Sequence, residues 1–336
     1  MLRTFVVAVW LFAFSSFSLA NDAAAAVGAG GLQLRREASI SMEKETLTIT
    51  SPKGEYGTVN VKYEFLNLSD QDIETEVAFP LPPEGAEDQS DHTTVTDFRV
   101  LVEGQEIPFE TDYKAILKGR DVTQVLRDLK LDLPDFGGFD WTEGSAAQIH
   151  QLPAADRARL VRAGLIEKNQ DFPLWQLLTT YHWRQKFPAH SVVHVEHEYR
   201  PISGRSNLAI GQVERAMRHQ KVKDINGNYG LLSLFCVNNE TVRRLRADVV
   251  AKYGTDPKHD WESVGVGWID YILTTANSWH GPIKDFELII KTDPGWHLAS
   301  CFDPSIAATT DTTMRLHFNN YTPTKELSIG FLYSMF

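Results

Sequence analysis

The sequence is poor in cysteine, and it lacks a block of basic residues. Only two cysteines occur among 336 residues, which excludes a framework of several disulfides. No run of lysine and arginine interrupts the acidic composition, and a formal net charge of -11 repels phosphate backbones and anionic lipid head groups. The composition therefore argues against nucleic acid as a partner.

The familiar motifs of catalysis are also missing. There is no Gly-x-Ser-x-Gly turn for a nucleophilic serine and no helical His-Glu-x-x-His pair. We therefore predict no catalytic, cofactor-binding or metal-binding residues and no cofactor. One alternative stays open, a periplasmic hydrolase whose acids converge in space with histidines such as His150, His182 and His190.

Long apolar runs are absent after the first twenty residues. That opening segment has Arg3, an apolar run from Phe5 to Phe14, and small residues from Ser18 to Ala20, the pattern of a secretory signal peptide. We expect cleavage between Ala20 and Asn21. No later segment approaches the roughly 20 apolar residues that a membrane-spanning helix needs. We therefore predict a periplasmic or secreted protein without a transmembrane segment in its mature chain.

Export places both cysteines in an oxidising compartment. We expect a disulfide between Cys236 and Cys301, which would close a loop of roughly 65 residues and contribute about 4 kcal/mol in the chain-entropy model. Two buried free thiols are the alternative, because a chain of this length does not need a disulfide in order to fold.

Alternation of apolar and polar residues dominates the segment from 21 to 113, which we assign as an N-terminal β-sandwich segment. The small residues of 21–38 predict a loosely ordered start. Strands are then predicted over 39–51, 58–70, 73–83 and 95–110, because their apolar residues recur with period two and turn residues or prolines end them. Short strands at this spacing are typical of a β-sandwich.

The middle of the chain has a helical pattern instead. In 120–134, Asp121 and Gln124 have the spacing of a capping box, and 152–166 has Pro153 at its start and Gly164 after its end. We assign 114–182 as a helical insertion. A β-sandwich can carry a lid or a partner-docking face in such an insertion.

The remaining segment, 183–336, returns to strand patterns. It holds one more clear amphipathic helix, over 238–254, and an Asn226-Gly227 pair typical of a hairpin turn. The predicted fold class is therefore mainly β (α+β): an antiparallel β-sandwich-type core with a helical insertion and one further amphipathic helix. We expect the two β segments to pack together as one compact domain over 21–336.

One stretch, HSVVHVEHEYRP at 190–201, concentrates histidines and acids. In a strand, His194, Glu196 and Glu198 lie on one face and His197 on the other, with the valines. This split leaves His190, His194 and Glu196 as the only ligands that could share an ion, whereas a tight zinc site wants three or four. We therefore expect a core strand with a polar outer face rather than a metal site.

Two further patterns suggest ligands but have simpler explanations. Asp224, Asn226 and Asn228 have the spacing of a calcium loop, but the required Gly and Glu are replaced by Tyr229 and Phe235, so a hairpin turn is favoured. A group of tryptophans in the last third could stack against sugar rings, although tryptophans of β-sandwiches usually fill or cover the core. This group consists of Trp261, Trp268, Trp279 and Trp296.

Several segments together resemble a known bacterial family, domain of unknown function 4424. They are NDAAAAVGAGGLQLRREASISMEKETLTI, VKYEFLNLSDQDIETEVAFPLPP, FPAHSVVHVEHEYRP, LFCVNNETVRRLR and YILTTANSWHGPIKDFELII. The resemblance implies an exported protein of Gram-negative-type bacteria, and it supplies no activity, cofactor or catalytic residue.

A weaker resemblance covers only 58–110. This stretch is similar to the β-sandwich module named for vault proteins and inter-alpha-trypsin inhibitors, in which a strand ending in Phe-Pro-Leu-Pro precedes a Phe-x-Val-x-Val-x-Gly hairpin. That module implies an interaction role. We therefore predict a non-enzymatic envelope protein that binds another envelope protein or a glycan.

Overall fold

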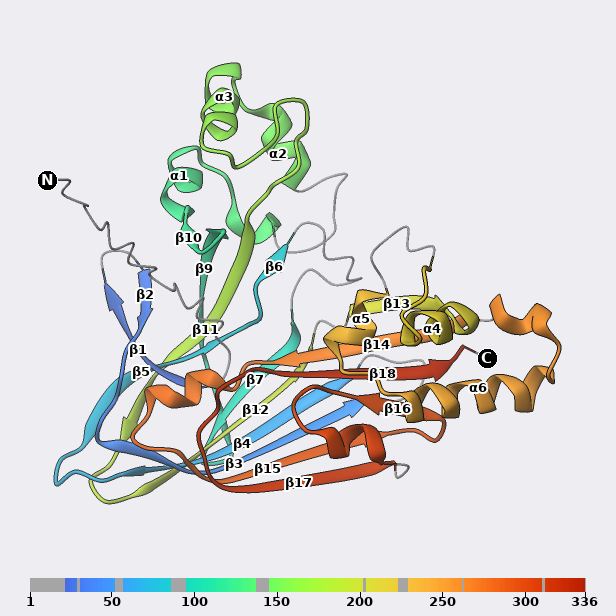
Figure 1. Cartoon of the computed structure of the whole chain (residues 1–336). Coiled ribbons are helices and arrows are strands. Elements are labelled where there is room, and N and C mark those ends of the chain that lie inside the picture. Colours follow the sequence, from blue (N-terminus) through green and yellow to red (C-terminus); the bar gives the residue numbers. More distant parts are fainter. Residues whose placement is uncertain are drawn as a thin grey trace, which may run out of the picture.

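The computed structural model describes residues 22–28, 31–51, 57–85, 95–136, 145–201, 204–222, 229–261, 263–309 and 312–335. These residues form three β-sheets, and helices are added to them in two places (Figure 1). Most neighbouring strands are antiparallel, so the predicted mainly β, sandwich-type fold is confirmed.

Sheet A contains the first strands of the chain and the two strands that lead into and out of the helical insertion. Strand β1 is an inner strand of this sheet, between β5 and β2. In spatial order the strands are β10 (Arg120–Asp121), β9 (Glu110–Leu117), β11 (Gln176–Phe187), β5 (Ile73–Pro80), β1 (Ala23–Gly28) and β2 (Gly31–Leu34), and β6 (Glu84–Gly85) also pairs with β11.

Sheet B also has seven strands, and it combines both ends of the sequence. Strand β3, from the first third of the chain, lies between β4 and β15, and β15, from the last third, runs parallel to it. In spatial order the strands are β17 (Thr313–Tyr321), β15 (Ile283–Thr292), β3 (Ile40–Ser51), β4 (Thr58–Asn67), β12 (Val192–Arg200), β7 (Thr96–Val102) and β8 (Gln105–Ile107).

A register shift in β3 decides which of its residues enter the core. The inward side chains Ile40 and Met42 stand at even positions, whereas Leu47 and Ile49 stand at odd ones. The pairing of β3 with β4 shifts between Met42 and Lys44, and an extra residue in one strand exchanges its two faces. As a result Glu45 also points inward and is fully buried.

Sheet C is built from the second half of the chain. Its strands in spatial order are β13 (Gly204–Ala209), β14 (Ser263–Tyr271), β18 (Leu327–Ser334) and β16 (Trp296–Ala299). One face of sheet C is covered by three helices, from which Val213, Leu232 and Leu245 pack against it. They are α4 (Ile210–Met217), α5 (Gly230–Leu234) and α6 (Asn239–Tyr253).

The main core lies between sheet B and the other two sheets. Phe65 of sheet B, Phe79 of sheet A and Phe331 of sheet C belong to this single apolar cluster. Sheet B thus lies below both other sheets in the view of Figure 1. Its opposite face carries the exposed residues of β17 and the exposed and half-buried polar residues of β12, and none of the described helices or sheets packs on it.

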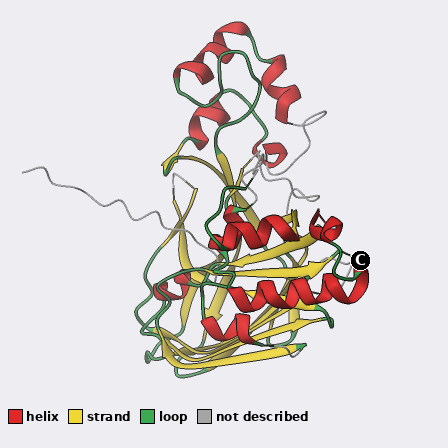
Figure 2. Cartoon of the chain, turned by 45° about the vertical axis from the view of Figure 1, so that its right-hand side comes forward, coloured by secondary structure: helices red, strands yellow, loops and turns green. Residues whose placement is uncertain are grey.

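The helical insertion has a separate apolar cluster, to which Leu126, Phe136 and Leu160 belong. Its helices stand at the top of Figures 1 and 2, and the cluster also contains Ala115 and Leu117 of β9 and Leu177 of β11. Its helices are α1 (Thr123–Asp128), η1 (Leu133–Phe136), α2 (Ser145–Gln151) and α3 (Ala154–Arg162). The segment 114–182 thus holds these helices together with the end of β9 and the start of β11, both of which belong to sheet A.

The expectation of a loosely ordered start was wrong for the described part of 21–38. Ala23, Ala24 and Ala25 are fully or almost fully buried, and β1 pairs with strands on both sides. Their methyl groups are small enough to sit under neighbouring strands, and pairing with β5 and β2 gives the backbone of β1 hydrogen-bond partners on both sides. The low strand propensity of these alanines was outweighed by the pairing of β1 with its neighbouring strands.

Several local predictions differ in detail. Asp121 accepts a hydrogen bond from the Thr123 amide, but the Gln124 side chain contacts Asp128, so the reciprocal half of the capping box is missing. Three helices outside the insertion replace the single one that the sequence indicated, because α4 and α5 are too short to show a clear period. The remaining short helices are η2 (Pro257–Trp261), η3 (Thr274–Ser278) and η4 (Pro304–Ala308).

None of the helices in the described residues has the length and apolar character needed to cross a membrane.

Candidate functional site

The outer face of sheet B carries the polar half of the stretch at 190–201. In β12, Val193, Val195, His197 and Tyr199 are buried, and the residues between them face outward. The two faces that period two predicts are therefore confirmed. His194, Glu196 and Glu198 lie outside, with Glu196 half-buried between its neighbours.

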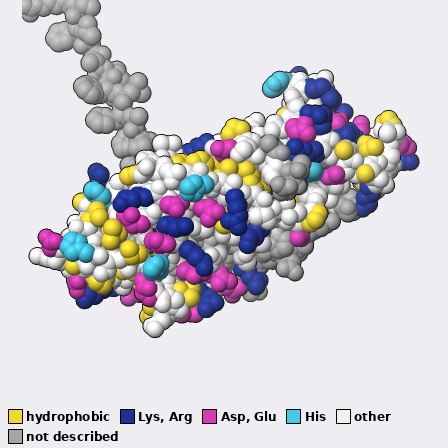
Figure 3. Space-filling view, turned by 90° about the horizontal axis from the view of Figure 1, so that it is seen from below, with side chains coloured by type: hydrophobic (Ala, Val, Ile, Leu, Met, Phe, Trp, Pro, Cys, Tyr) yellow, Lys and Arg dark blue, Asp and Glu magenta, His cyan; other side chains and the backbone are white. Residues whose placement is uncertain are grey.

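Charged side chains of opposite sign alternate across this face. Lys44 lies 3.6 Å from Asp285, and Lys62 lies 3.4 Å from Glu196. Asn60 donates a hydrogen bond of 2.6 Å to the same Glu196 carboxylate. Figure 3 views the molecule from below and shows Lys and Arg side chains interleaved with Asp and Glu on this side. Exposed pairs of this kind contribute about 0–1 kcal/mol each, so stability does not explain the pattern.

A shallow hollow lies near the middle of this face, with a volume of about 200 Å³. Glu64 is one of its lining residues and faces Lys44 and His194 across the neighbouring strands. Lys44 pairs with Asp285 and His194 with Glu103, so Glu64 keeps no ion-pair partner among the described residues. The hollow is lined by Lys44, Thr46, Lys62, Tyr63, Glu64, Leu101, Gly104, His194, Val195 and Glu196.

The possible metal ligands of the stretch do not meet. His190 bonds to Asp70 at 2.8 Å in the turn before the strand, and His194 pairs with Glu103. The described residues contain no group of three or more His, Cys, Asp or Glu side chains placed to hold a metal ion. Each histidine of the stretch thus has its own carboxylate.

His197 forms a buried pair with Asp22. Its Nε2 lies 2.8 Å from Oδ1 of Asp22, and both side chains have no exposed surface. Burial raises the pKa of the Asp22 carboxyl, and the neighbouring His197 opposes that rise. The rings of Phe79, Phe98 and Trp183 surround the imidazole. The pair is therefore closed to ligands and belongs to the core.

A second buried polar group lies in the same core. The hydroxyls of Tyr63 and Tyr271 are 2.8 Å apart, and Tyr271 donates a 3.1 Å hydrogen bond to Glu45. Burial is the main cause that raises the pKa of both tyrosines well above the ordinary value, so both hydroxyls keep their protons. Sequence reasoning missed Glu45, because the shift in β3 that buries it is a property of the paired strands.

The histidines that a hydrolase would need are dispersed. His150 lies beside Asp171 in the insertion, His182 beside Glu76 in sheet A, and His190 beside Asp70 in a turn. Each contact joins one imidazole to one carboxylate. Within the described residues they do not build a shared cleft.

The four tryptophans of the last third have different surroundings. Trp279 is buried and donates from Nε1 to the carbonyl of Asp22 at 2.6 Å. Trp268 packs so closely on Gly204 that a Cβ there would lie 1.8 Å from its ring. Trp261 is 67% exposed. Trp296 is among the residues that line a hollow at the edge of sheet C.

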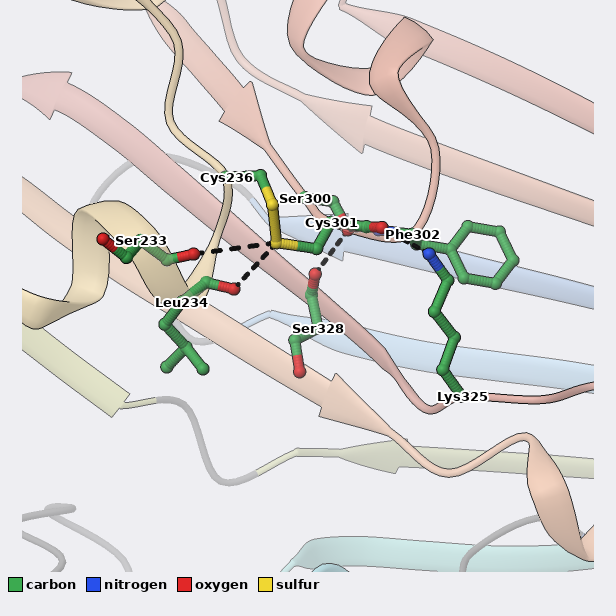
Figure 4. Close-up of a disulfide and its surroundings, with 8 residues drawn as sticks. All are labelled: Ser233, Leu234, Cys236, Ser300, Cys301, Phe302, Lys325 and Ser328. Atoms are coloured by element: carbon green, nitrogen blue, oxygen red, sulfur yellow. Dashed lines mark hydrogen bonds between the residues drawn. A yellow bond between two sulfur atoms is a disulfide. The ribbon is translucent and has the colours of Figure 1, made fainter.

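The two cysteines are joined in the structure. Cys236 and Cys301 form a disulfide whose Cα atoms are 5.0 Å apart, and it ties the segment after α5 to the segment after β16 (Figure 4). The Cys301 sulfur lies 3.3 Å from the carbonyl oxygen of Leu234. A disulfide sulfur has no proton to donate, so this is a packing contact.

Two features considered in the sequence fall on positions outside the described residues. They are the cleavage position, Ala20 and Asn21, and the calcium-like triplet of Asp224, Asn226 and Asn228. Within the described residues, Phe235 stands at the twelfth position of that loop. It is fully buried in the apolar cluster between sheet C and the helices α4, α5 and α6. An apolar ring cannot replace the bidentate carboxylate that a calcium loop requires there.

Comparison with solved structures gives only distant likenesses. A Legionella pneumophila protein named "putative nutrient binding protein" has a TM-score of 0.41 and 12% identity, over 93% of this chain and 69% of that chain. An M1 zinc metallopeptidase from Deinococcus radiodurans has a TM-score of 0.30 and 8% identity, over 88% of this chain and 43% of the peptidase. Likenesses at this level carry no argument about function. The sequence matches no curated protein.

The family comparison is much more extensive. The model of the family described as "Domain of unknown function (DUF4424)" matches residues 20–329. It therefore spans all three sheets, the insertion, and the disulfide. The resemblance drawn from the sequence is confirmed, and this chain belongs to the DUF4424 family.

Proposed function

We propose that this chain is an exported, non-enzymatic binding protein that holds a protein partner of the cell envelope on the outer face of sheet B. The observation that carries the proposal is the face itself. It is one whole side of a seven-stranded sheet, and the described part of the chain leaves it uncovered. Backbone pairing along every strand makes such a face rigid, so its side chains are held in fixed positions before a partner arrives.

The size of the hollow favours a large partner. Pockets for small ligands have volumes of about 300–1,000 Å³, and the hollow beside Glu64 has about 200 Å³. A single side chain of a partner fits it. The surrounding pairs would form the polar part of a protein interface, where charge gives specificity and a faster association.

The charge of the face indicates which side chains the partner presents to it. Acids outnumber bases among the outward residues of β4, β12, β7 and their neighbours, and Glu64 has no ion-pair partner among the described side chains. We therefore propose a partner that presents lysine or arginine. The outward acids include Glu64, Asp97, Glu103, Glu106, Glu196, Glu198, Asp285 and Glu287, and the outward bases include Lys44, Lys62, Arg99, Arg200, Lys291 and Arg315.

Export is part of the same proposal. It is supported by the leader-like residues 1–20 and by the Cys236–Cys301 disulfide, because disulfides persist in oxidising compartments. The alternative hypothesis, a periplasmic hydrolase, gains no support from the dispersed positions of His150, His182 and His190.

Site-specific photocrosslinking in cells tests the proposal. A crosslinking amino acid at Thr48, which faces outward between Asn60 and Ile289, should trap one defined protein. The double substitution Glu64→Lys and Glu196→Lys should abolish that product, and Glu167→Lys, an exposed acid of the insertion, should leave it unchanged. A product that survives the double substitution would refute this site, and so would the absence of any product.

A further inference from the structure

Strand β17 forms one edge of sheet B and has a partner on one side only. It pairs with β15 and stands last in the strand order of the sheet, so none of the described strands pairs with its other side. In Figure 1 it runs along the bottom of the sheet. An edge of this kind presents a row of backbone N–H and C=O groups that can pair with a further strand.

The pairing with β15 determines which backbone groups of β17 face the free side. The Thr292 N–H donates to the Thr312 carbonyl at 2.8 Å, in the register that the two strands keep. Hydrogen-bonded and non-hydrogen-bonded pairs alternate along an antiparallel ladder, so every second residue after Thr312 bonds to β15 and those between point away. Bonded to β15 are Met314, Leu316 and Phe318, and directed to the free side are Thr313, Arg315, His317 and Asn319.

β17 lacks the features that usually keep a sheet edge from pairing. Natural edge strands are short, or carry proline, lysine or a bulge. β17 has nine residues and contains neither proline nor lysine, and its pairing with β15 has no register shift over 313–319. The opposite edge of the same sheet, β8, has only three residues. Of the two edges of sheet B, β17 is therefore the one open to pairing.

The inward side of β17 is apolar and only partly covered. Leu316 and Phe318 pack against the main core and are half-buried. Phe302, from the segment after β16, contacts Phe318 with 5.9 Å between the ring centroids. A second strand laid along β17 would cover the apolar surface that these side chains still expose, which favours its association.

The charges of the edge are balanced within one chain. Arg315 lies 2.8 Å from Glu287, and His317 lies 2.8 Å from Asp285. Each basic side chain of the edge thus has its own acid on β15. Two copies of this edge can therefore meet without bringing an unpaired charge against another of the same sign, which would be destabilising across a pair of strands.

From these features we propose that two copies of the chain pair through β17, in antiparallel orientation, around a two-fold axis at Leu316. This register uses the outward backbone groups of both copies from Thr313 to Asn319. It places Leu316 opposite Leu316 of the second copy and Met314 opposite Phe318, so the half-buried side chains cover one another. Each copy contributes the same strand, as in most two-fold dimers, and the two sheets become one continuous sheet.

The dimer does not depend on the proposed function. It uses the backbone edge of sheet B, whereas the protein partner is placed on the side chains of the outer face. Loss of the photocrosslinked product at Thr48 therefore leaves the dimer untouched, and a monomeric protein leaves that product untouched.

A cysteine at the two-fold axis tests the pairing. Leu316 would belong to a non-hydrogen-bonded pair, with Cα atoms about 4.5 Å apart, and a disulfide spans about 4.4–6.8 Å between Cα atoms. Because Cys236 and Cys301 are bonded to each other, Leu316→Cys introduces the only free thiol. We expect mild oxidation to give a covalent dimer on a non-reducing gel. Ile107→Cys, half-buried on the opposite edge, should remain a monomer on the same gel.

Two substitutions of one residue separate backbone pairing from side-chain contact. His317→Pro removes an N–H that points to the free side, and proline is tolerated at such edge positions. His317→Ala removes the same imidazole and keeps the N–H. By sedimentation equilibrium we expect wild type and His317→Ala to dimerise with a dissociation constant of about 10 μM or tighter, and His317→Pro to raise it at least about tenfold. Thermal unfolding is the folding control for His317→Pro.

Three results would overturn the proposal. One is a wild-type protein that stays monomeric at about 100 μM, tenfold above the expected constant. Another is a dimer that a folded His317→Pro forms as tightly as the wild type, since the contact would then lie elsewhere. The third is Leu316→Cys that crosslinks no better than Ile107→Cys, which needs no disruptive substitution and so does not depend on how well the proline variant folds.

Discussion

Asp22 and His197 form a hydrogen-bonded pair that has no contact with solvent, with 2.8 Å between Oδ1 and Nε2. The two residues are 175 positions apart. Asp22 immediately precedes β1, so the pair attaches the start of the described chain to the centre of sheet B. The carbonyl of the same residue accepts the hydrogen bond from Trp279, which strengthens the attachment.

Removal of one partner of this pair should be costly. His197→Ala leaves the Asp22 carboxyl buried without its partner, and we expect a loss of about 3–5 kcal/mol in the free energy of unfolding. Urea unfolding measures it. His194→Ala, on the exposed face of the same strand, should change stability by less than about 0.5 kcal/mol.

A double-mutant cycle checks the assignment to the pair. Asp22→Ala combined with His197→Ala should cost clearly less than the sum of the two single substitutions, because no polar group of the pair is then left buried without its partner. If the two losses simply add, the two side chains are not coupled, and their contact contributes nothing to the free energy of unfolding.

Loss of the disulfide should lower stability without changing the fold. Cys236→Ser together with Cys301→Ser removes a link between positions 65 residues apart, which predicts a loss of about 4 kcal/mol by the entropy of loop closure. Chemical denaturation of the variant and of the oxidised wild type measures the difference. Equal midpoints for the two proteins would contradict the estimate.

Acid should weaken the insertion through Asp171. Desolvation raises the pKa of this carboxyl, but hydrogen bonds and charge from Arg157 and His150 outweigh it, so its pKa lies below the ordinary 3.8. The folded state therefore binds this proton less tightly than the unfolded chain does. The resulting stability is complete above pH 3.8 and is lost as the pH falls through the lowered value.

Arg157→Ala should remove this acid-dependent contribution. Arg157 donates to Asp171 at 2.8 Å and also to the carbonyls of Lys168 and Gln170, and we expect a loss of about 1–2 kcal/mol at neutral pH. NMR titration of the Asp171 carboxyl should show its pKa rising. Arg159→Ala is the matched control on α3, because its contact with Asp156 is 3.8 Å long and exposed.

Two glycines of β14 should respond very differently to an added methyl group. A Cβ on Gly265 would lie 2.3 Å from the Tyr333 ring, whereas a Cβ on Gly267 would meet only a backbone oxygen at 3.9 Å. We expect Gly265→Ala to lose about 1–3 kcal/mol through overpacking and Gly267→Ala to lose much less. Thermal unfolding of both variants compares them, and similar melting temperatures would contradict the packing of Tyr333.

Much of the secondary structure followed from local patterns. Val59, Val61, Tyr63 and Phe65 alternate in β4 as the sequence indicates, because a half-buried strand exposes every second side chain to water. The same rule separated His197 from His194. Gly254 ends α6 with a φ of 78°, a left-handed conformation that glycine adopts without steric cost.

The candidate sites were less predictable, because they combine distant segments. The contact between Trp296 and Tyr333 needs the two residues to be opposed in neighbouring strands, and no local pattern specifies that register. The outer face of sheet B likewise brings Lys44 next to Asp285. Only the pairing of β3 with β15 creates that contact.

The sequence by itself determined the β-rich class, the polar and apolar sides of its strands, and the family, because these depend on the order and period of residues along the chain. Tertiary structure alone decided the three-sheet arrangement, the burial of Glu45, and the inner position of the alanine strand β1. These features depend on which strands pair and in which register. Pairing is settled by the total burial of apolar surface across the whole molecule, to which each short segment contributes only a part.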